Sequence, residues 1–131
     1  MSAKMETALK QVRGLGSARE GARHWWHERV SALASLILSG WFVVSLLRLP
    51  AYDRGTIVEW LGSPLAAVPM ALLIITTFWH LKMGVIVVIE DYVHEEGSKL
   101  FWVTLVNFLA ILGAGLALFA LFKIAVTGSA A

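Results

Sequence analysis

Long apolar segments alternate with short polar ones along the chain. Three of the apolar segments, at residues 30–49, 65–89 and 100–122, are long enough to cross a bilayer, because a membrane-spanning α-helix needs about 20 mostly apolar residues. Arg48 and Pro50 end the first segment, and the third contains no charged residue. The pattern therefore predicts an all-α protein with three transmembrane helices.

The segments outside the predicted spans are short. Residues 1–23 are rich in Gly, Ala, Ser and Arg, and residues 1–29 are expected to form a cytoplasmic N-terminal segment. Residues 30–125 would form one three-span membrane domain, and residues 126–131 a short tail. Tryptophan favours the membrane–water interface, and Trp60 and Trp102 lie near the ends of predicted spans.

The composition agrees with a membrane protein and indicates an orientation. Hydrophobic residues make up 58% of the 131 positions and charged residues only 15%, which excludes an ordinary soluble domain. Most basic residues precede the first span, namely Lys4, Lys10, Arg13, Arg19, Arg23 and Arg29. Since Lys and Arg accumulate on the cytoplasmic side, we expect a cytoplasmic N-terminus and a C-terminus across the membrane.

The N-terminal region also bears on partners and location. Its basic residues are interspersed with Glu6, Glu20 and Glu28, so a nucleic-acid partner is not expected. It lacks an Arg- and Ser-rich, acid-poor leader, which favours a bacterial inner membrane over the mitochondrial inner membrane. The absence of cysteine excludes disulfides and any thiolate-ligated iron–sulfur cluster held by this chain alone.

Small residues recur on one face of two spans. Ser31, Ser35 and Ser39 are four residues apart in the first span, and Gly113 and Ala117 are four apart in the third. Small side chains let membrane helices approach closely, and serine hydroxyls can bond across the interface. We interpret both patterns as helix-packing surfaces.

His80 lies inside the second span, where an ionisable side chain is costly and indicates function. At about 1.5 Å of rise per residue, it is about 18 Å from Tyr92 and near mid-membrane if Tyr92 marks the cytoplasmic surface. Asp91 falls within roughly 20° of the same helix face, and Gly84 removes a side chain one turn beyond the imidazole. Two interpretations stay open: a hydrogen bond to a neighbouring helix, or an axial ligand of a haem that lies against the gap at Gly84.

Other polar residues extend these interpretations. His24, His27 and His94 lie outside the predicted spans, so a haem held by two histidines would take its second ligand from another polypeptide. Lys82 lies about 200° around the helix from His80. It would pair with an acidic group on a partner or add positive potential near the site.

The sequence resembles the small cytochrome b membrane-anchor subunit of succinate dehydrogenase, respiratory complex II. The resemblance rests on His80 with Gly84, on the run Glu-Asp-Tyr-Val-His at residues 90–94, and on the run Trp-Trp-His-Glu-Arg at residues 25–29. It covers residues 14–125 and implies a three-span chain within a heterodimeric, multi-helix anchor bundle.

This resemblance implies a role for each of five residues. His80 would bind the iron of haem b, and a larger cytochrome b anchor subunit would supply the second axial ligand. Tyr92 would donate a hydrogen bond to a carbonyl oxygen of ubiquinone, and Asp91 would orient the quinone or relay protons. Arg29 and His24 would lie beside the haem propionates, with His27 as an alternative to His24.

The same resemblance implies that the chain docks an iron–sulfur subunit and a flavoprotein subunit to the membrane and binds no succinate itself. It would be part of an enzyme without being one alone. The alternatives are an anchor of a quinol:fumarate reductase, a small non-redox transporter subunit, and a scaffold without cofactor. For Asp91, a solvated helix end or an ion pair with Lys99 is the alternative to a role at the quinone.

Overall fold

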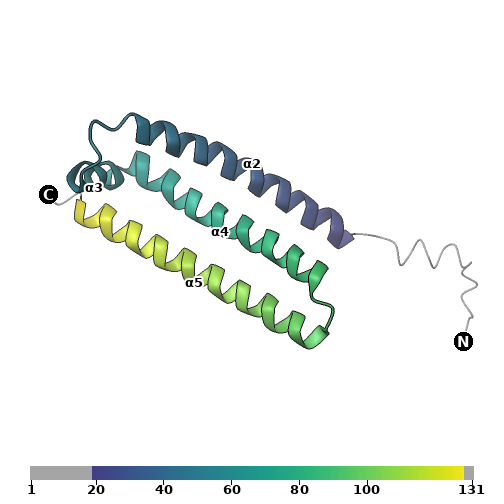
Figure 1. Ribbon diagram of the computed structural model, residues 1–131. Helices are drawn as coiled ribbons and strands as arrows, with labels where there is room; N and C mark the ends of the chain where they lie inside the picture. Colours follow the sequence, from purple (N-terminus) through teal and green to yellow (C-terminus); the bar gives the residue numbers. More distant parts are fainter. Residues whose placement is uncertain (1–18, 129–131) are drawn as a thin grey trace, which may run out of the picture.

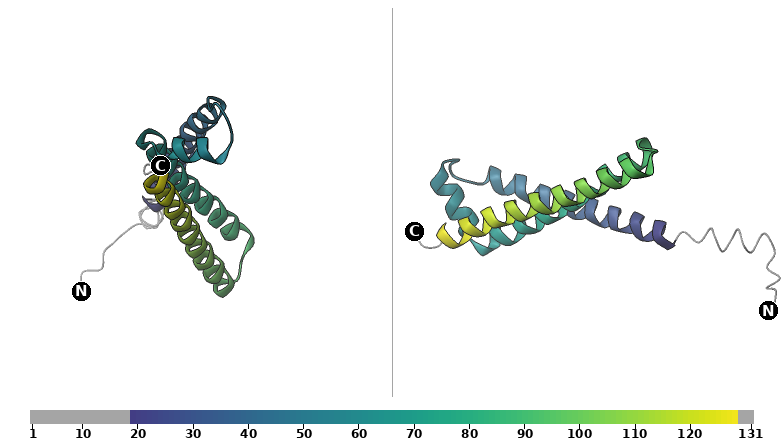
Figure 2. Two further views of the ribbon diagram at one scale, coloured as in Figure 1. Left: turned by 90° about the vertical axis from the view of Figure 1, so that its left-hand side faces the viewer. Right: turned by 90° about the horizontal axis from the view of Figure 1, so that it is seen from below.

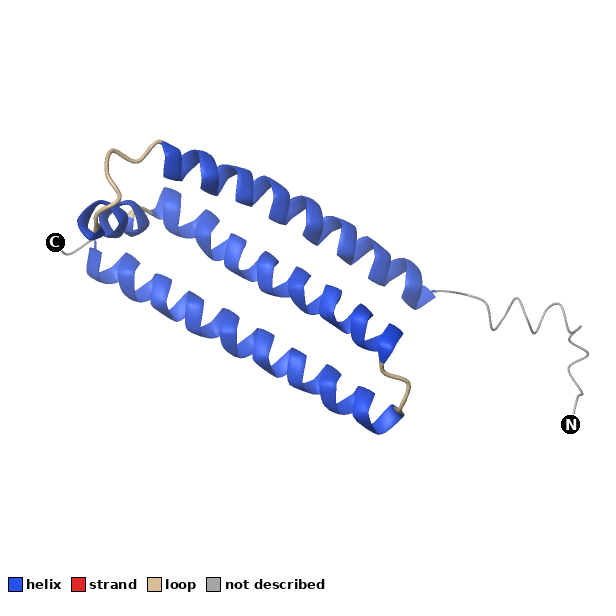
Figure 3. Cartoon of the chain, viewed as in Figure 1, coloured by secondary structure: helices blue, strands red, loops and turns tan. Residues whose placement is uncertain are grey.

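The computed structural model describes residues 19–128, and within them every regular element is an α-helix (Figures 1 and 3). The helices are α2 (Arg19–Leu47), α3 (Arg54–Gly62), α4 (Pro64–Tyr92) and α5 (Glu96–Gly128). The all-α prediction is therefore confirmed.

Three of the helices are long and apolar enough to cross a membrane, at Trp25–Leu47, Pro64–Tyr92 and Glu96–Thr127. This confirms the prediction of three spans, and the protein is a multi-pass membrane protein. The helices extend beyond the predicted spans: α2 begins at Arg19 and α5 continues to Gly128. The physical reason is that hydropathy marks only the part inside the hydrocarbon, whereas a helix continues outward until a residue breaks it.

The three long helices lie side by side with α4 in the middle (Figure 1). Helix α4 packs against both α2 and α5. Helix α2 is inclined to the α4–α5 pair, so that it crosses them when the molecule is seen from below (Figure 2). The central helix is therefore the one that carries His80, and each of its neighbours covers a different side of it.

The short helix α3 lies across the end of the bundle where α2 ends and α4 begins (Figure 1). It contacts both α4 and α5. Its N-cap is Asp53, whose carboxylate accepts hydrogen bonds from the backbone N–H groups of Gly55 at 2.9 Å and Thr56 at 3.3 Å. This helix was not predicted, although Asp at the cap position before an apolar run is a helix-start signal.

Trp60 connects α3 to the end of α2. Its ring centroid lies 6.2 Å from that of Trp41 and 6.4 Å from that of Phe42. Aromatic pairs at such distances are favourable beyond the area that they bury. Trp60 therefore holds the connection between two spans in place.

A glycine permits close approach between α4 and α5. A Cβ atom added at Gly113 would lie only 2.6 Å from Cε1 of Phe78. The ring of Phe78 therefore occupies the space that any larger residue at position 113 would need. This contact confirms that the small residues of the third span mark a packing surface.

Most of the apolar surface faces outward. Among the described residues, only Ala66, Met83, Leu121 and Ser31 are buried. In each span, only 6% of the most apolar stretch is buried inside the chain. A surface of this kind needs lipid or further apolar helices around it.

Candidate functional site

His80 lies near the middle of the central helix. Because α4 is continuous from Pro64 to Tyr92, His80 is about 24 Å along the axis from the first residue and about 18 Å from the last. Ser63 and Pro64 start the helix, since proline is suited to the first helical position. The half-buried imidazole thus lies about halfway across a span, as the sequence predicted.

The imidazole contacts α2 through Ser31, which is only 7% exposed. The Ser31 Oγ lies 3.1 Å from Nδ1 of His80. The same hydroxyl donates to the backbone carbonyl of Glu28 at 3.0 Å. Both distances are in the hydrogen-bond range. The first of the two interpretations of His80, a hydrogen bond to a neighbouring helix, is therefore confirmed, and the bond uses one ring nitrogen.

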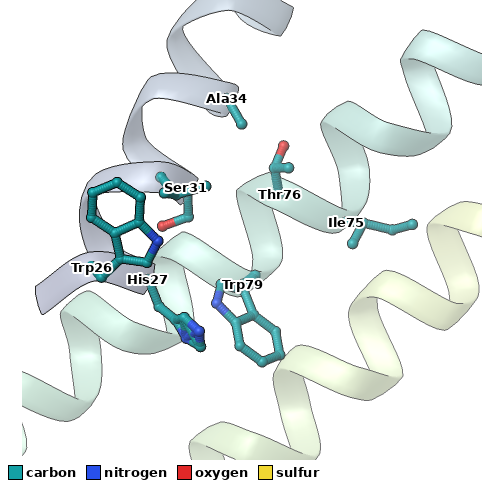
Figure 4. A pocket seen from close by; sticks show the side chains of 8 residues that line it. Trp26, His27, Ser31, Ala34, Ile75, Thr76 and Trp79 are labelled. Carbon is teal, nitrogen blue, oxygen red and sulfur yellow. The ribbon is translucent and has the colours of Figure 1, made fainter. Parts of the chain in front are cut away.

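A groove of about 380 Å³ lies between α2 and α4, and Ser31 is one of the residues that line it (Figure 4). Its walls are mostly apolar. Residues of α2 and α4 line it, namely Trp26, His27, Val30, Ser31, Ala34, Ile75, Thr76 and Trp79. The wall of the groove therefore includes the hydroxyl of Ser31, two indole rings and the imidazole of His27.

His27 corrects one sequence-based expectation. It was placed outside the spans, but it lies within the span Trp25–Leu47 and lines the groove together with Ser31 (Figure 4). The reason is that α2 begins well before the apolar run, so that His27 is four residues before Ser31 and shares its helix face. His27 therefore does not lie outside the spans, as His94 does.

Gly84 leaves the surface of α4 open one turn beyond His80. A Cβ atom at this position would meet nothing within 4 Å. Packing within the described chain therefore does not require glycine here. A flat group that lies against this face of α4 would require it.

Arg29 and His24 were the expected propionate partners. The Arg29 guanidinium carbon lies 5.4 Å from the centroid of the Trp25 ring, and its side chain is exposed. Two residues correspond to about 200° around a helix, so Arg29 faces away from the side of α2 that carries Ser31. The side chain of His24 lies outside the described residues. The role of both residues stays a prediction.

Asp91 and Tyr92 are the last two residues of α4, which continues three residues beyond the predicted end of the span at residue 89. The backbone N–H of Val93 bonds to the carbonyl of Ile89 at 2.9 Å and ends the helix. Asp91 is exposed, and the Tyr92 side chain is 78% exposed. Both side chains are therefore accessible to a partner or a ligand at the end of the span.

The ammonium group of Lys82 contacts an aromatic ring of its own helix, a contact that was not predicted. Its Nζ lies 4.1 Å from the centroid of the Trp79 ring, close enough for a cation–π interaction. Residues three apart on a helix are neighbours, so the spacing of Trp79 and Lys82 in the sequence could have predicted the contact. The contact places the ammonium group beside an indole that also lines the groove.

The fold and the site together define a polytopic membrane protein with an imidazole near the middle of one spanning helix, hydrogen-bonded to a neighbouring one. The model of the succinate dehydrogenase/fumarate reductase transmembrane subunit family matches residues 3–126. The chain belongs to this family.

Three relatives agree with this assignment. The succinate dehydrogenase hydrophobic membrane anchor subunit of Paracoccus denitrificans is 34% identical over 86 residues, which are 66% of this chain and 67% of the relative. The subunit of the same name from Rickettsia bellii (strain RML369-C) is 31% identical over 85 residues, 65% of this chain and 68% of the relative. The succinate dehydrogenase membrane anchor subunit of Reclinomonas americana is 30% identical over 97 residues, 71% of this chain and 80% of the relative. No solved structure matches the chain significantly.

Proposed function

We propose that this chain is the small membrane-anchor subunit of a succinate:quinone oxidoreductase, where it helps to bind haem b and ubiquinone. The observation that carries the proposal is the imidazole of His80, which Ser31 contacts near the middle of a spanning helix in a chain of this family. The relatives are named as subunits of succinate dehydrogenase, which favours succinate oxidation as the direction.

The residues around His80 suit a haem. Imidazole is a common axial ligand of haem iron, and only Nδ1 of His80 takes part in a hydrogen bond within the described part of the chain. A Cβ atom added at Gly84 would meet nothing within 4 Å, which is compatible with a planar ring against this face of α4. When bound, the haem would supply one-electron chemistry at this depth in the membrane.

The chain's own residues would hold and position the haem. His80 would donate an imidazole nitrogen to the iron, and Ser31 would hold the ring. Arg29 and His24 would lie near the propionates, where a guanidinium makes charge-assisted hydrogen bonds. The second axial ligand would come from a larger anchor subunit, as the resemblance implies.

Quinone would bind at the end of α4, where Tyr92 is exposed. The phenol would donate a hydrogen bond to a quinone carbonyl, and Asp91 would orient the quinone or relay the protons that its reduction needs. Quinone reduction takes up two protons as well as two electrons, so a site at the aqueous end of a span suits it. A site deeper in the hydrocarbon would lack this access to water.

The exposed apolar faces of the three spans would pack against the larger anchor subunit and lipid. The polar end at Tyr92 would face the iron–sulfur subunit, which the flavoprotein covers. Clustering of basic residues before the first span supports a cytoplasmic N-terminus in a bacterial inner membrane. This chain would bind no succinate.

The test is a spectrum of the complex extracted from membranes with its accompanying subunits. The wild-type complex should show reduced b-type absorption bands. His80→Leu should weaken or remove them, whereas His94→Leu should leave them unchanged because His94 is exposed beyond α4. A colourless wild-type complex that reduces quinone at a full rate would refute the haem assignment.

A second variant addresses the quinone site in the same complex. Tyr92→Phe removes one neutral hydrogen bond, worth about 0.5–1.5 kcal/mol, so kcat/KM for quinone should fall about two- to tenfold. The b-type bands and succinate oxidation with a water-soluble acceptor should not change. Unaltered quinone kinetics would exclude Tyr92 from the site.

A further inference from the structure

The hydroxyl of Ser31 has two hydrogen-bond contacts but only one hydrogen. Its oxygen lies 3.0 Å from the carbonyl oxygen of Glu28 and 3.1 Å from Nδ1 of His80. A backbone carbonyl oxygen can only accept a hydrogen bond, whereas a neutral imidazole nitrogen is either a donor or an acceptor. The roles of the three groups are therefore linked.

Only one assignment makes both contacts hydrogen bonds. If Ser31 donates to Glu28, its oxygen must accept at His80, and Nδ1 must carry the proton. If instead Ser31 donates to Nδ1, the hydroxyl oxygen and the Glu28 carbonyl oxygen lie 3.0 Å apart with no hydrogen between them. Two acceptors in that position repel each other in a low-dielectric setting, where unpaired polar groups are costly.

From this network we infer that Ser31 is a positioning residue that fixes the tautomer of His80. A neutral imidazole with a proton on Nδ1 has its lone pair on Nε2, which is the atom left to bind a metal. The inference rests on the proposed haem site and adds the identity of the ligating atom and of the group that orients the ring.

Ser31 is suited to this role by its surroundings. It is almost fully buried, so water does not compete for the Nδ1 proton. Metal-bound histidines usually donate their other N–H to a fixed acceptor, which orients the ring and makes the ligand more basic. A more basic ligand donates more electron density to iron and stabilises its oxidised state.

The experiment compares Ser31→Ala with two matched variants in the purified complex. Ser31→Thr keeps a hydroxyl that can still bond to a backbone carbonyl one turn earlier. Ser35→Ala removes a second serine of the same stripe, whose buried Oγ has no hydrogen-bond partner among the described residues. The readouts are haem retained per complex during washing with a haem-scavenging protein, and the midpoint potential from a spectroscopic redox titration.

Ser31→Ala should weaken haem binding about 10- to 100-fold, the usual effect of losing such an acceptor, and should raise the midpoint potential. Ser31→Thr should restore both quantities, and Ser35→Ala should leave both at the wild-type values. If Ser31→Ala does not assemble, Ser31→Cys offers a weaker acceptor of similar shape and should raise the potential in the same direction.

The outcomes separate this inference from the proposed function. Wild-type potential and haem retention in both Ser31→Ala and Ser31→Cys would overturn the positioning role, while the b-type bands would still support a haem at His80. Equal changes in Ser31→Ala and Ser35→Ala would also overturn it, because they would indicate a general packing effect. A wild-type complex without b-type bands would instead refute the haem site itself.

Discussion

Gly113→Ala should loosen the contact between α4 and α5. The added Cβ would lie 2.6 Å from Cε1 and 3.0 Å from Cζ of Phe78. Ordinary carbon–carbon contacts begin at about 3.5 Å, so the edge of the ring would have to move by about 0.9 Å. Phe78 is two residues before His80 on the same helix, so the disturbance begins close to the proposed haem ligand.

The expected change in stability on Gly113→Ala follows from two opposing effects. An extra methyl group in a packed contact typically costs about 1–3 kcal/mol. Replacing glycine by alanine inside a helix recovers about 1 kcal/mol of helix propensity. Gly115→Ala provides the matched control, because a Cβ there meets nothing within 4 Å and only the propensity term applies. Gly113→Ala should therefore be about 1–3 kcal/mol less stable than Gly115→Ala.

The assay is the denaturation midpoint of the detergent-solubilised complex, measured for both variants under one set of conditions. A further variant, Phe78→Leu combined with Gly113→Ala, should recover much of the lost stability because the rigid ring is gone. Non-additive changes in stability in a double-mutant cycle of Phe78→Leu and Gly113→Ala would identify the Phe78 ring as the obstacle. The reasoning fails if Gly113→Ala and Gly115→Ala have the same midpoint, or if Phe78→Leu brings no recovery.

Two further predictions concern the open face of α4 and the cap of α3. Gly84→Leu adds a side chain whose Cβ would meet nothing within 4 Å in the described chain, and it should lose haem by filling the space of the proposed cofactor. Gly115→Leu is the control, because a Cβ there is equally unobstructed, and full haem content in the Gly84 variant would contradict the prediction. For Asp53, hydrogen bonds from the Thr56 side chain and backbone hold the carboxyl pKa below its ordinary value of 3.8. The charged cap therefore stabilises α3 fully above pH 3.8 and less as the pH falls below that value. In thermal melts, Asp53→Ala should have a lower melting temperature than the wild type at neutral pH, and the difference should shrink in acid. A difference that does not change with pH would exclude the carboxylate charge as its cause.

The sequence was sufficient to predict the three spans and the position of His80 near the middle of the second. Both depend on length and hydropathy, which the lipid environment imposes on any spanning helix. The extent of α2 was underestimated, because the segment before residue 30 is helical without being continuously apolar. That error removed His27 from the span and hence from the expected site.

Which side of one helix meets which side of the next was not predictable. The spans are apolar around most of their circumference, so no amphipathic stripe specifies the crossing. The serine stripe indicated that α2 would pack closely, but any of its members could have met α4. Contact between Ser31 and His80 depends on the actual crossing of the two helices, and so does the groove beside them.

A hydrogen bond to a neighbouring helix and a bond to iron had been treated as competing explanations for His80. An imidazole has two nitrogens, however, and each can serve one purpose. Nδ1 contacts Ser31 at 3.1 Å, and this bond leaves the other nitrogen free of hydrogen bonds within the described residues. A buried acceptor on one side of the ring is also what most metal-bound histidines possess. The helix-packing bond is therefore compatible with the proposed bond to iron, because each would use a different nitrogen of the same ring.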